Sequence, residues 1–581
     1  MSSTRWADAP TDVTRPAPLA GAGRVAGAAA LIAVLTVVSR LAGFGRTAVF
    51  TWTLAPTDLG GTYIVANAVP NLIFEIVAGG ALASLVVPLL AGPVEAGDRK
   101  TVARTTGALL TWTLALLVPL AVLVVLFAEP IVGLQGNGLT AAQQQSGARM
   151  LQVFAPQLPL YGIGIVLTGV LQAHRRFAWP VIAPLLSSLT VIVVYLGFTA
   201  LEGRLATVSD VSADGELLLS AGTTLGVVVL SLSLLIPLRR LRLRLRPGFG
   251  FPAEARARVR GLVAAGAITV TAQQVALAVS INQVAYGTAD SPGVYNLAWT
   301  VYLLPWAVLA VPLAVAAYPT LAAARAAGDE QAYRSTLAPT VRSVLLFSSL
   351  GAAALVGTAV PVGHLFFPGS ATTAGAAAAA IAGFAPGLLG YGLFAVLTRA
   401  LYARGETRAA TVATAVGWLL VPVAVLLFGA VLPTGDRVLA VALANSVGML
   451  LLGGLLIVAV RRTAGAAALA GAPRAAAAGL LGGLAGALAG VGVLRWLDTP
   501  GDGTPTVGAA LGQGMLSGVL VGVVFLAVVW LVDRQAVRPL LAGVLRRLGR
   551  GGGRGHGSAG TAREQDGSPP ERGDGKETVS G

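Results

Sequence analysis

Apolar residues dominate this chain in runs of about 20 or more that recur from Val25 to Val532. Such a run is long enough for a helix to cross a bilayer, and in lipid only helices or closed barrels satisfy every backbone hydrogen bond. We therefore expect an all-α polytopic membrane protein with about fourteen transmembrane helices. The expected spans are 25–54, 61–91, 105–128, 147–173, 177–201, 216–238, 261–287, 293–323, 338–366, 374–403, 408–432, 437–460, 475–496 and 507–532.

The loops between these spans alternate in charge. One set holds Arg99, Lys100, Arg175, Arg176, Arg325, Arg404, Arg461 and Arg462, and the other holds Asp58, Asp210, Asp214, Asp290, Asp436, Asp498 and Asp502. Basic loops stay in the cytoplasm, so an even number of spans places both termini there. The densest basic run is RRLRLRLR at 239–246. We interpret it as an anchor of this topology, with binding of anionic lipid or a partner as the alternative.

Two halves of the chain resemble each other at an offset of about 231 residues. LTGVLQAHRRFAWPV at 167–181 matches LTRALYARGETRAATV at 397–412, and VPNLIFEIVAGGALASLVVPLL at 69–90 matches VYLLPWAVLAVPLAVAAYPTL at 301–321. Six spans separate the copies, so both have the same orientation, as in transporters with two parallel repeats. We expect a tail at 1–24, a first six-helix lobe at 25–238, a basic loop at 239–260, a second lobe at 261–460, two further helices at 475–535 and a disordered tail at 548–581.

Composition supports this interpretation and excludes others. The chain is 55% hydrophobic and 11% charged, where a soluble protein carries about 25% charge. The net charge of +15 comes from arginines in short loops and in the tail, which fits membrane topology better than nucleic-acid binding. The chain has no cysteine, so it has neither disulfides nor thiolate metal sites.

Two arginines, Arg40 and Arg46, lie inside the first apolar span. A cation at membrane depth costs a few kcal/mol or more unless it faces a watery cavity, has a partner or reaches the surface. Six residues apart, the two differ by about 120° around a helix and about 9 Å along it, and Gly43 and Gly45 permit a bend between them. An inward-facing pair would suit the passage of a polyanionic headgroup, so we expect both in a central cavity, with snorkelling of Arg46 outward to the surface as the alternative.

Other polar residues at membrane depth are candidates for supporting roles. Glu75 in the second span could neutralise one of the arginines or couple transport to protons or ions. Asn71 lies one turn from Asn67 on the same helix face. Gln273 is of interest because the duplication places it near the counterpart of Arg40, although most amides in membrane helices only join helices together. Paired carboxylates, a P-loop and an HExxH motif are absent from the sequence, so we expect a transporter with no catalytic residues, no metal and no cofactor.

These motifs resemble the MurJ/MviN lipid II flippases of the MOP exporter superfamily. The similarity lies in SRLAGFGR at 39–46, VPN at 69–71, GALASLVVPLL at 80–90, RRFAWPVIAP at 175–184 and YPTLAAA at 318–324. The resemblance implies a bacterial plasma-membrane flippase that moves the undecaprenyl-linked peptidoglycan precursor from the inner to the outer leaflet by alternating access. It also implies a cationic cavity containing Arg40 and Arg46, coupling to membrane potential, Na⁺ or H⁺, and divisome or elongasome proteins as partners beside membrane lipids.

The chain departs from the family pattern at four positions. Gly61, Phe74, Gly79 and Thr300 stand where the family has charged residues. Alternatives to lipid II transport are therefore export of another polyprenyl-linked glycan or of a drug, and a non-transporting scaffold of the cell envelope. A drug exporter would have acids rather than arginines in its cavity, and a scaffold would have Arg40 buried with no cavity.

Overall fold

The computed structural model describes residues 22–76, 83–136, 138–243, 245–250, 253–497 and 504–534, in which helices and short turns occur and no strand does. The predicted tails and Gly79 lie outside these ranges, apart from residues 22–24. Contacts divide the chain into one unit, Met1–Asp533, and a second, Arg534–Gly581, of which only Arg534 is described.

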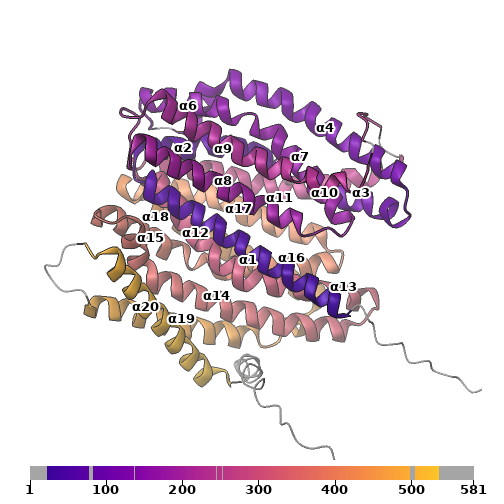
Figure 1. The fold of residues 1–581 in the computed structure, drawn as a ribbon. Coiled ribbons are helices and arrows are strands. Elements are labelled where there is room, and N and C mark those ends of the chain that lie inside the picture. Colours follow the sequence, from indigo (N-terminus) through magenta and orange to yellow (C-terminus); the bar gives the residue numbers. More distant parts are fainter. Residues whose placement is uncertain are drawn as a thin grey trace, which may run out of the picture. The chain divides into compact units, whose positions relative to one another are not determined.

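The first half of the chain folds into the helices coloured from indigo to magenta in Figure 1. We call them the first lobe: α1 (Ala22–Thr53), α2 (Asp58–Phe74), α3 (Ala83–Glu95), α4 (Arg99–Leu126), α5 (Ala128–Gln135), α6 (Ala141–Phe154), α7 (Gln157–Ala173), α8 (Trp179–Glu202), α9 (Ala213–Ser233) and α10 (Leu235–Arg239).

The second half repeats this order and adds two helices. The second lobe comprises α11 (Ala253–Ala285), α12 (Ser291–Pro305), the π-helical segment η2 (Trp306–Ala310), α13 (Val311–Ala326), α14 (Glu330–Phe366), α15 (Ala371–Phe384), α16 (Gly387–Ala403), α17 (Thr407–Val431), the short turn η3 (Thr434–Asp436) and α18 (Arg437–Ala464). The turn η4 (Ala466–Leu469) leads to α19 (Ala472–Leu497), and α20 (Val507–Val532) follows.

The described helices include ten segments long and apolar enough to cross a membrane, or eleven if the bent pair α15 and α16 counts as one. The remaining predicted spans correspond to α1, to α2 with α3, and to α11. The all-helical membrane fold is confirmed, whereas the count of fourteen stays a prediction. Two predicted continuous spans are interrupted at Pro156 and Pro386, where α6 gives way to α7 and α15 to α16. Proline lacks the N–H that would continue the helix, and α15 and α16 meet at 44°.

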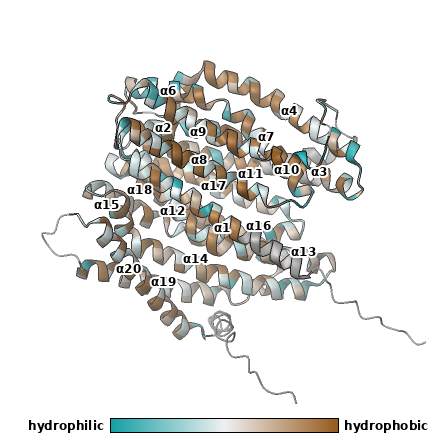
Figure 2. Ribbon diagram, viewed as in Figure 1, coloured by the Kyte–Doolittle hydropathy of each residue, from teal (hydrophilic) through white to brown (hydrophobic). Residues whose placement is uncertain are grey.

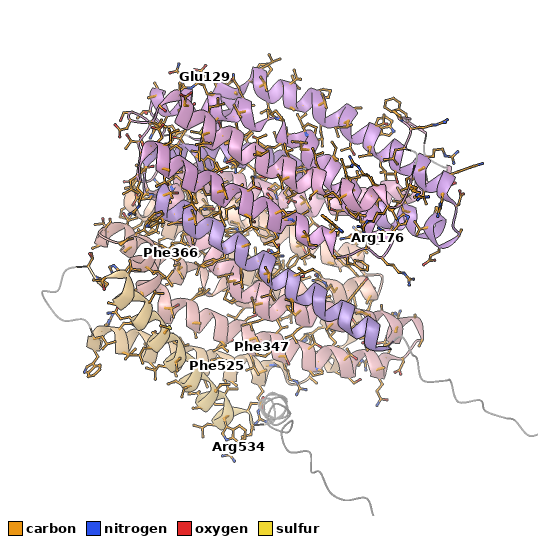
Figure 3. The ribbon with its side chains drawn as sticks, in the orientation of Figure 1. Glu129, Arg176, Phe347, Phe366, Phe525 and Arg534 are labelled. Atoms are coloured by element: carbon orange, nitrogen blue, oxygen red, sulfur yellow. The ribbon has the colours of Figure 1, made fainter. Side chains whose placement is uncertain are left out.

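Charge separates the two ends of the helices. Figure 2 shows hydrophilic residues gathered at both ends of the bundle, and Figure 3 places Glu129 at one end and Arg176 at the other. We call the end with Asp58, Glu129 and Asp290 the acidic end, and the end with Arg99, Arg176 and Arg404 the basic end. The separation is what the alternating loops predict.

The duplication is visible in the structure at the level of single residues. The bounds of α6 and α15 differ by 230 residues at both ends, as do those of α7 and α16. Asp98 caps α4 by accepting a hydrogen bond from the Thr101 N–H at 3.0 Å, and Asp329 caps α14 in the same way from the Ala332 N–H at 2.8 Å. Glycines with positive φ, Gly97 and Gly328, precede both caps. The two lobes are therefore built on one plan, while the domain limits stay a prediction.

The additional helices cover only one lobe. α19 and α20 pack against each other and against α14 of the second lobe. Their packing is close because small residues meet: Gly479 and Gly483 of α19 face Ser349 of α14. Membrane helices associate through such small residues because lipid provides no hydrophobic drive for them to pack. The counterpart of α14 in the first lobe, α4, has no such cover among the described helices, and many of its apolar side chains are exposed.

Candidate functional site

A cavity of about 320 Å³ lies between the lobes. Helices α1, α2, α7, α8 and α9 of the first lobe supply most of its wall, and α11 and α12 of the second lobe supply the rest. The volume falls at the lower end of the range of small-molecule sites. The polar and charged residues of the wall are Arg46, Thr47, Tyr63, Asn67, Asn71, Tyr161, Ser187, Tyr195, Thr223, Tyr295, Asn296 and Trp299.

Arg46 is the one charged residue among the described residues of this wall. It is exposed, and no ion pair joins it to a described carboxylate. A guanidinium presents five N–H donors in a planar fork that matches phosphate or carboxylate, and it stays charged at every physiological pH. The cavity therefore carries a fixed positive charge available to an anionic ligand.

Two amides on α2 line the wall close to this arginine. The Asn71 side chain donates to the Asn67 carbonyl oxygen at 2.9 Å, which fixes its orientation. The Asn67 Oδ1 atom is buried without a hydrogen-bond partner among the described residues. A buried polar atom without a partner is costly, and such atoms gather at functional sites.

Hydroxyl groups form another part of the wall. The Tyr63 hydroxyl lies 2.9 Å from that of Tyr195 and 3.0 Å from that of Thr223, and Thr223 in turn donates to the Leu219 carbonyl at 2.7 Å. Tyr63 and Tyr195 are both nearly fully buried. This network joins α2, α8 and α9, and it provides neutral hydrogen-bonding groups in place of further charges.

The lobes are in close contact at the acidic end of the cavity. A Cβ at Gly293 of α12 would overlap the carbonyl oxygen of Ala55 in the α1–α2 turn, so the two backbones touch. The Asn282 side chain donates to the Leu134 carbonyl at 2.7 Å, and Gln135 donates to the Ala278 carbonyl at 3.0 Å. These contacts close the cavity toward the acidic end.

The predicted site residues are distributed unevenly around this cavity. Arg46 and Asn71 lie on its wall, whereas Arg40, Glu75 and Gln273 do not. Arg40 and Glu75 are exposed, and no ion pair links Glu75 to either arginine. Gln273 lines a smaller space of about 30 Å³ inside the second lobe, which shares Leu277, Tyr295 and Trp299 with the wall of the main cavity.

The described departures from the family pattern have structural explanations. Gly61 is buried against the second lobe, where a Cβ would lie 3.2 Å from the Ala289 carbonyl and 3.3 Å from Pro292, so a charged side chain has no room there. Phe74 stacks on Tyr161 with ring centroids 4.6 Å apart and supports the cavity wall from behind. Thr300 donates to the Asn296 carbonyl at 2.8 Å and does not line the cavity.

The tyrosines are the residues that sequence reasoning missed. Tyr63 has its counterpart in Tyr295 at an offset of 232, and Tyr161 has its counterpart in Tyr391 at an offset of 230. The stack of Phe74 on Tyr161 is repeated by Trp306 on Tyr391, again at 4.6 Å. The duplication was therefore the signal that could have identified them.

Comparison with known proteins agrees with this architecture. A family model described as lipid II flippase MurJ matches residues 53–494, which is most of the chain. A "probable lipid II flippase MurJ" of Synechocystis sp. is 28% identical over 208 residues, 35% of this chain and 38% of that protein. The lipid II flippase MurJ of Thermosipho africanus is 22% identical over 163 residues, 28% of this chain and 34% of that protein. The chain thus matches little more than a third of the length of these curated relatives.

Solved structures show the same fold at low sequence identity. A lipid II flippase MurJ in an inward closed conformation superposes with a TM-score of 0.67 and 18% identity, over 86% of this chain and 98% of that one. An inward-facing multidrug resistance MATE family transporter of the MOP superfamily gives a TM-score of 0.57 and 15% identity, over 75% and 99%. Because the family model covers most of the chain, the protein belongs to the lipid II flippase MurJ family.

Proposed function

We propose that the protein moves lipid II, or a closely related polyprenyl-pyrophosphate-linked glycan, from the inner to the outer leaflet of the bacterial plasma membrane by alternating access. The observation that supports this is Arg46, a fixed cation on the wall of a cavity between two lobes built on one plan. Family membership supports the choice of a lipid-linked cell-wall precursor as the substrate.

The described wall favours an anionic substrate over a cationic drug. It contains one guanidinium and no carboxylate, so a cationic ligand would meet like charge. The pyrophosphate would bind Arg46 with Asn71, and the tyrosine and threonine hydroxyls would bind the sugar. The described wall carries a single cation, which favours a second candidate, a glycan carrier with a less charged headgroup than lipid II.

We propose that the basic end and both termini face the cytoplasm, because basic loops are retained there. The headgroup then moves outward when the contacts around Gly293 separate. A negative-inside potential favours outward movement of an anion by about 2.3 kcal/mol per charge per 100 mV. Arg40 would guide the headgroup along α1 before it reaches Arg46, and Glu75 and Gln273 would serve coupling to Na⁺ or H⁺. Divisome or elongasome proteins would receive the product.

Complementation tests the proposal. In a bacterium depleted of its own lipid II flippase, this chain should restore growth and the exposure of labelled precursor on the outer leaflet. Arg46→Gln should abolish both at normal protein abundance, while Arg461→Gln, which removes an exposed arginine at the basic end, should abolish neither. Restoration by Arg46→Gln would refute the role of this cation.

The remaining alternatives give different results in the same cells. A carrier of another glycan would fail to restore growth yet expose a different lipid-linked sugar. A scaffold without transport would expose neither lipid II nor another lipid-linked sugar. If the membrane potential drives transport, its collapse with an ionophore should slow the exposure of labelled precursor. An unchanged rate of exposure would indicate that an ion gradient drives transport instead.

A further inference from the structure

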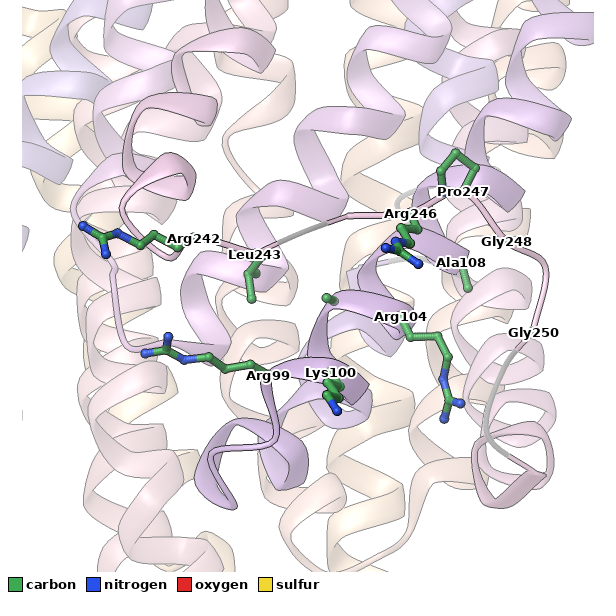
Figure 4. A pocket seen from close by; sticks show the side chains of 11 residues that line it. Arg99, Lys100, Arg104, Ala108, Arg242, Leu243, Arg246, Pro247, Gly248 and Gly250 are labelled. Carbon is green, nitrogen blue, oxygen red and sulfur yellow. The ribbon is translucent and has the colours of Figure 1, made fainter.

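Outside the central cavity, five basic side chains surround a hollow of about 710 Å³ at the basic end (Figure 4). Arg99, Lys100 and Arg104 come from the first turns of α4, and Arg242 and Arg246 come from the loop after α10. All five are exposed, and no ion pair joins any of them to a described carboxylate. We call this group the basic pocket. Its unneutralised charge makes it a binding place for an anion.

An apolar groove continues from this pocket along α4. It has a volume of about 700 Å³, shares Arg246 and Pro247 with the basic pocket, and is lined by Leu110, Leu114 and Val118 among others. A cationic pocket joined to an apolar groove on a membrane-facing helix has the two parts of a phospholipid site, one for the phosphate and one for an acyl chain.

The loop is fixed against α4 rather than free. A Cβ at Gly107 would overlap the carbonyl oxygen of Arg246, so the loop lies directly on the helix backbone. The Gly248 N–H donates to the Thr111 hydroxyl at 3.1 Å, and the Trp112 indole donates to the Phe249 carbonyl at 3.1 Å. The arginines of the loop are therefore held over the start of the groove.

The duplication explains why the groove is open. With the offset of 231 set by the caps Asp98 and Asp329, the groove residues Thr111, Leu114 and Val118 correspond to Arg342, Leu345 and Ser349 of α14. Those three positions are in contact with the chain of η4 and α19, through Gly471, Gly479 and Gly483. In the second lobe a protein helix thus covers the face that the first lobe leaves open to lipid.

The three basic positions of α4 that line the pocket are not basic in the second lobe. The counterparts of Arg99, Lys100 and Arg104 on α14 are Glu330, Gln331 and Ser335. A basic pocket therefore accompanies the uncovered helix and is missing from the covered one. A feature needed only for membrane topology would not require this pairing of charge with an open groove.

We propose that an anionic phospholipid of the surrounding bilayer binds here, with its phosphate on the basic pocket and one acyl chain in the groove along α4. The site is separate from the transport cavity, because none of its lining residues lies on the cavity wall. The loop between α10 and α11 connects the two lobes. Bound lipid would hold this loop against the outer face of the first lobe.

Lipid retention measures the proposal directly. The intact protein is purified in detergent with phosphatidylglycerol or phosphatidylcholine of equal chain length, and bound lipid is counted by native mass spectrometry. We expect one phosphatidylglycerol to be retained in preference to phosphatidylcholine. One basic side chain near an anionic lipid is worth about fivefold in affinity, so Arg104→Gln with Arg246→Gln should weaken retention about 25-fold.

Matched variants decide between a built site and general attraction. Arg239→Gln with Arg240→Gln removes the same charge at the end of α10, outside the pocket, and should leave retention unchanged. Leu114→Trp fills the groove, so it should weaken the binding of phosphatidylglycerol but not the binding of glycerol phosphate, which has no acyl chain. Equal loss in both arginine pairs, or competition by glycerol phosphate as strong as by the lipid, overturns the proposal. Elution volume and melting temperature identify any variant that is misfolded. If the Arg104→Gln and Arg246→Gln pair is misfolded, Lys100→Gln replaces it as the variant of the pocket.

Discussion

Substitution of Gly293 by alanine should separate the lobes at the acidic end. The added Cβ would lie 2.6 Å from the Ala55 carbonyl carbon and 2.7 Å from its Cβ, whereas ordinary contacts begin at 3.4 Å. The two backbones would therefore have to move apart by at least 0.8 Å. Because backbone atoms cannot rotate away as a flexible side chain does, the strain acts on the interface between lobes.

The size of the effect follows from the cost of overpacking. Inserting one methyl group into a close-packed contact costs about 1–3 kcal/mol. If the state that is open at the acidic end relieves all of this strain, the ratio of open to closed protein rises roughly 5- to 150-fold. Folding should change little, because each lobe keeps its own internal packing.

Cysteine labelling measures that ratio without background, because the chain has no cysteine of its own. Asn296→Cys places one thiol on the cavity wall. A membrane-impermeant maleimide added from the side of the acidic end should label it faster in the Gly293→Ala protein, by the factor given above. Gly375→Ala is the control, since a Cβ there meets nothing within 4 Å. An unchanged labelling rate in folded Gly293→Ala protein would refute the idea that this contact closes the cavity.

Three further substitutions test the packing, the duplication and the charges. Gly390→Ala should lower the melting temperature markedly, at a cost of about 1–3 kcal/mol, because its Cβ would overlap the backbone of α18, whereas Gly454→Ala on α18 has open space and should change little. Asp98→Ala and Asp329→Ala should each cost about 1 kcal/mol, and similar losses in thermal unfolding would show that the two caps are equivalent. Hydrogen bonds from an arginine hold the pKa of Glu330 below its ordinary value of 4.5, so the stability it adds is present above that pH and is lost as the pH falls through the lowered pKa. Glu330→Gln should therefore lower the melting temperature at pH 7 and make no difference in acid, and an equal difference at both pH values would contradict this assignment.

The helices and the duplication could be predicted from the sequence because lipid allows the backbone few alternatives. A run of 20 apolar residues in a bilayer has to be helical, so the bounds of α20 were predicted to the residue. The cost of a cation at membrane depth directed attention to Arg46, which does lie on the cavity wall.

The rotation of each helix could not be predicted in the same way. Arg40 and Glu75 meet the same criterion as Arg46 but do not lie on the wall, because neighbouring helices and not the local sequence decide which way a residue faces. Tyr63 and Tyr195 were missed since a tyrosine in an apolar run carries no sign of its partner, which here lies 132 residues away. The groove on α4 depends on where α19 packs, so it could be recognised only once both lobes were seen.

Both lobes contain a wide helical turn at the same depth. Glu75 and Ile76, at the end of α2, are π-helical, as is η2 from Trp306 to Ala310 at the corresponding place in the second lobe. Such a turn accommodates one residue more than an α-helical turn, and transfer of that extra residue to a neighbouring turn rotates the intervening segment by about 100° without loss of hydrogen bonds. In the second lobe, where α12, η2 and α13 follow one another without a break, this gives the span a built-in way to turn one face of a helix toward or away from the cargo while the helix stays continuous.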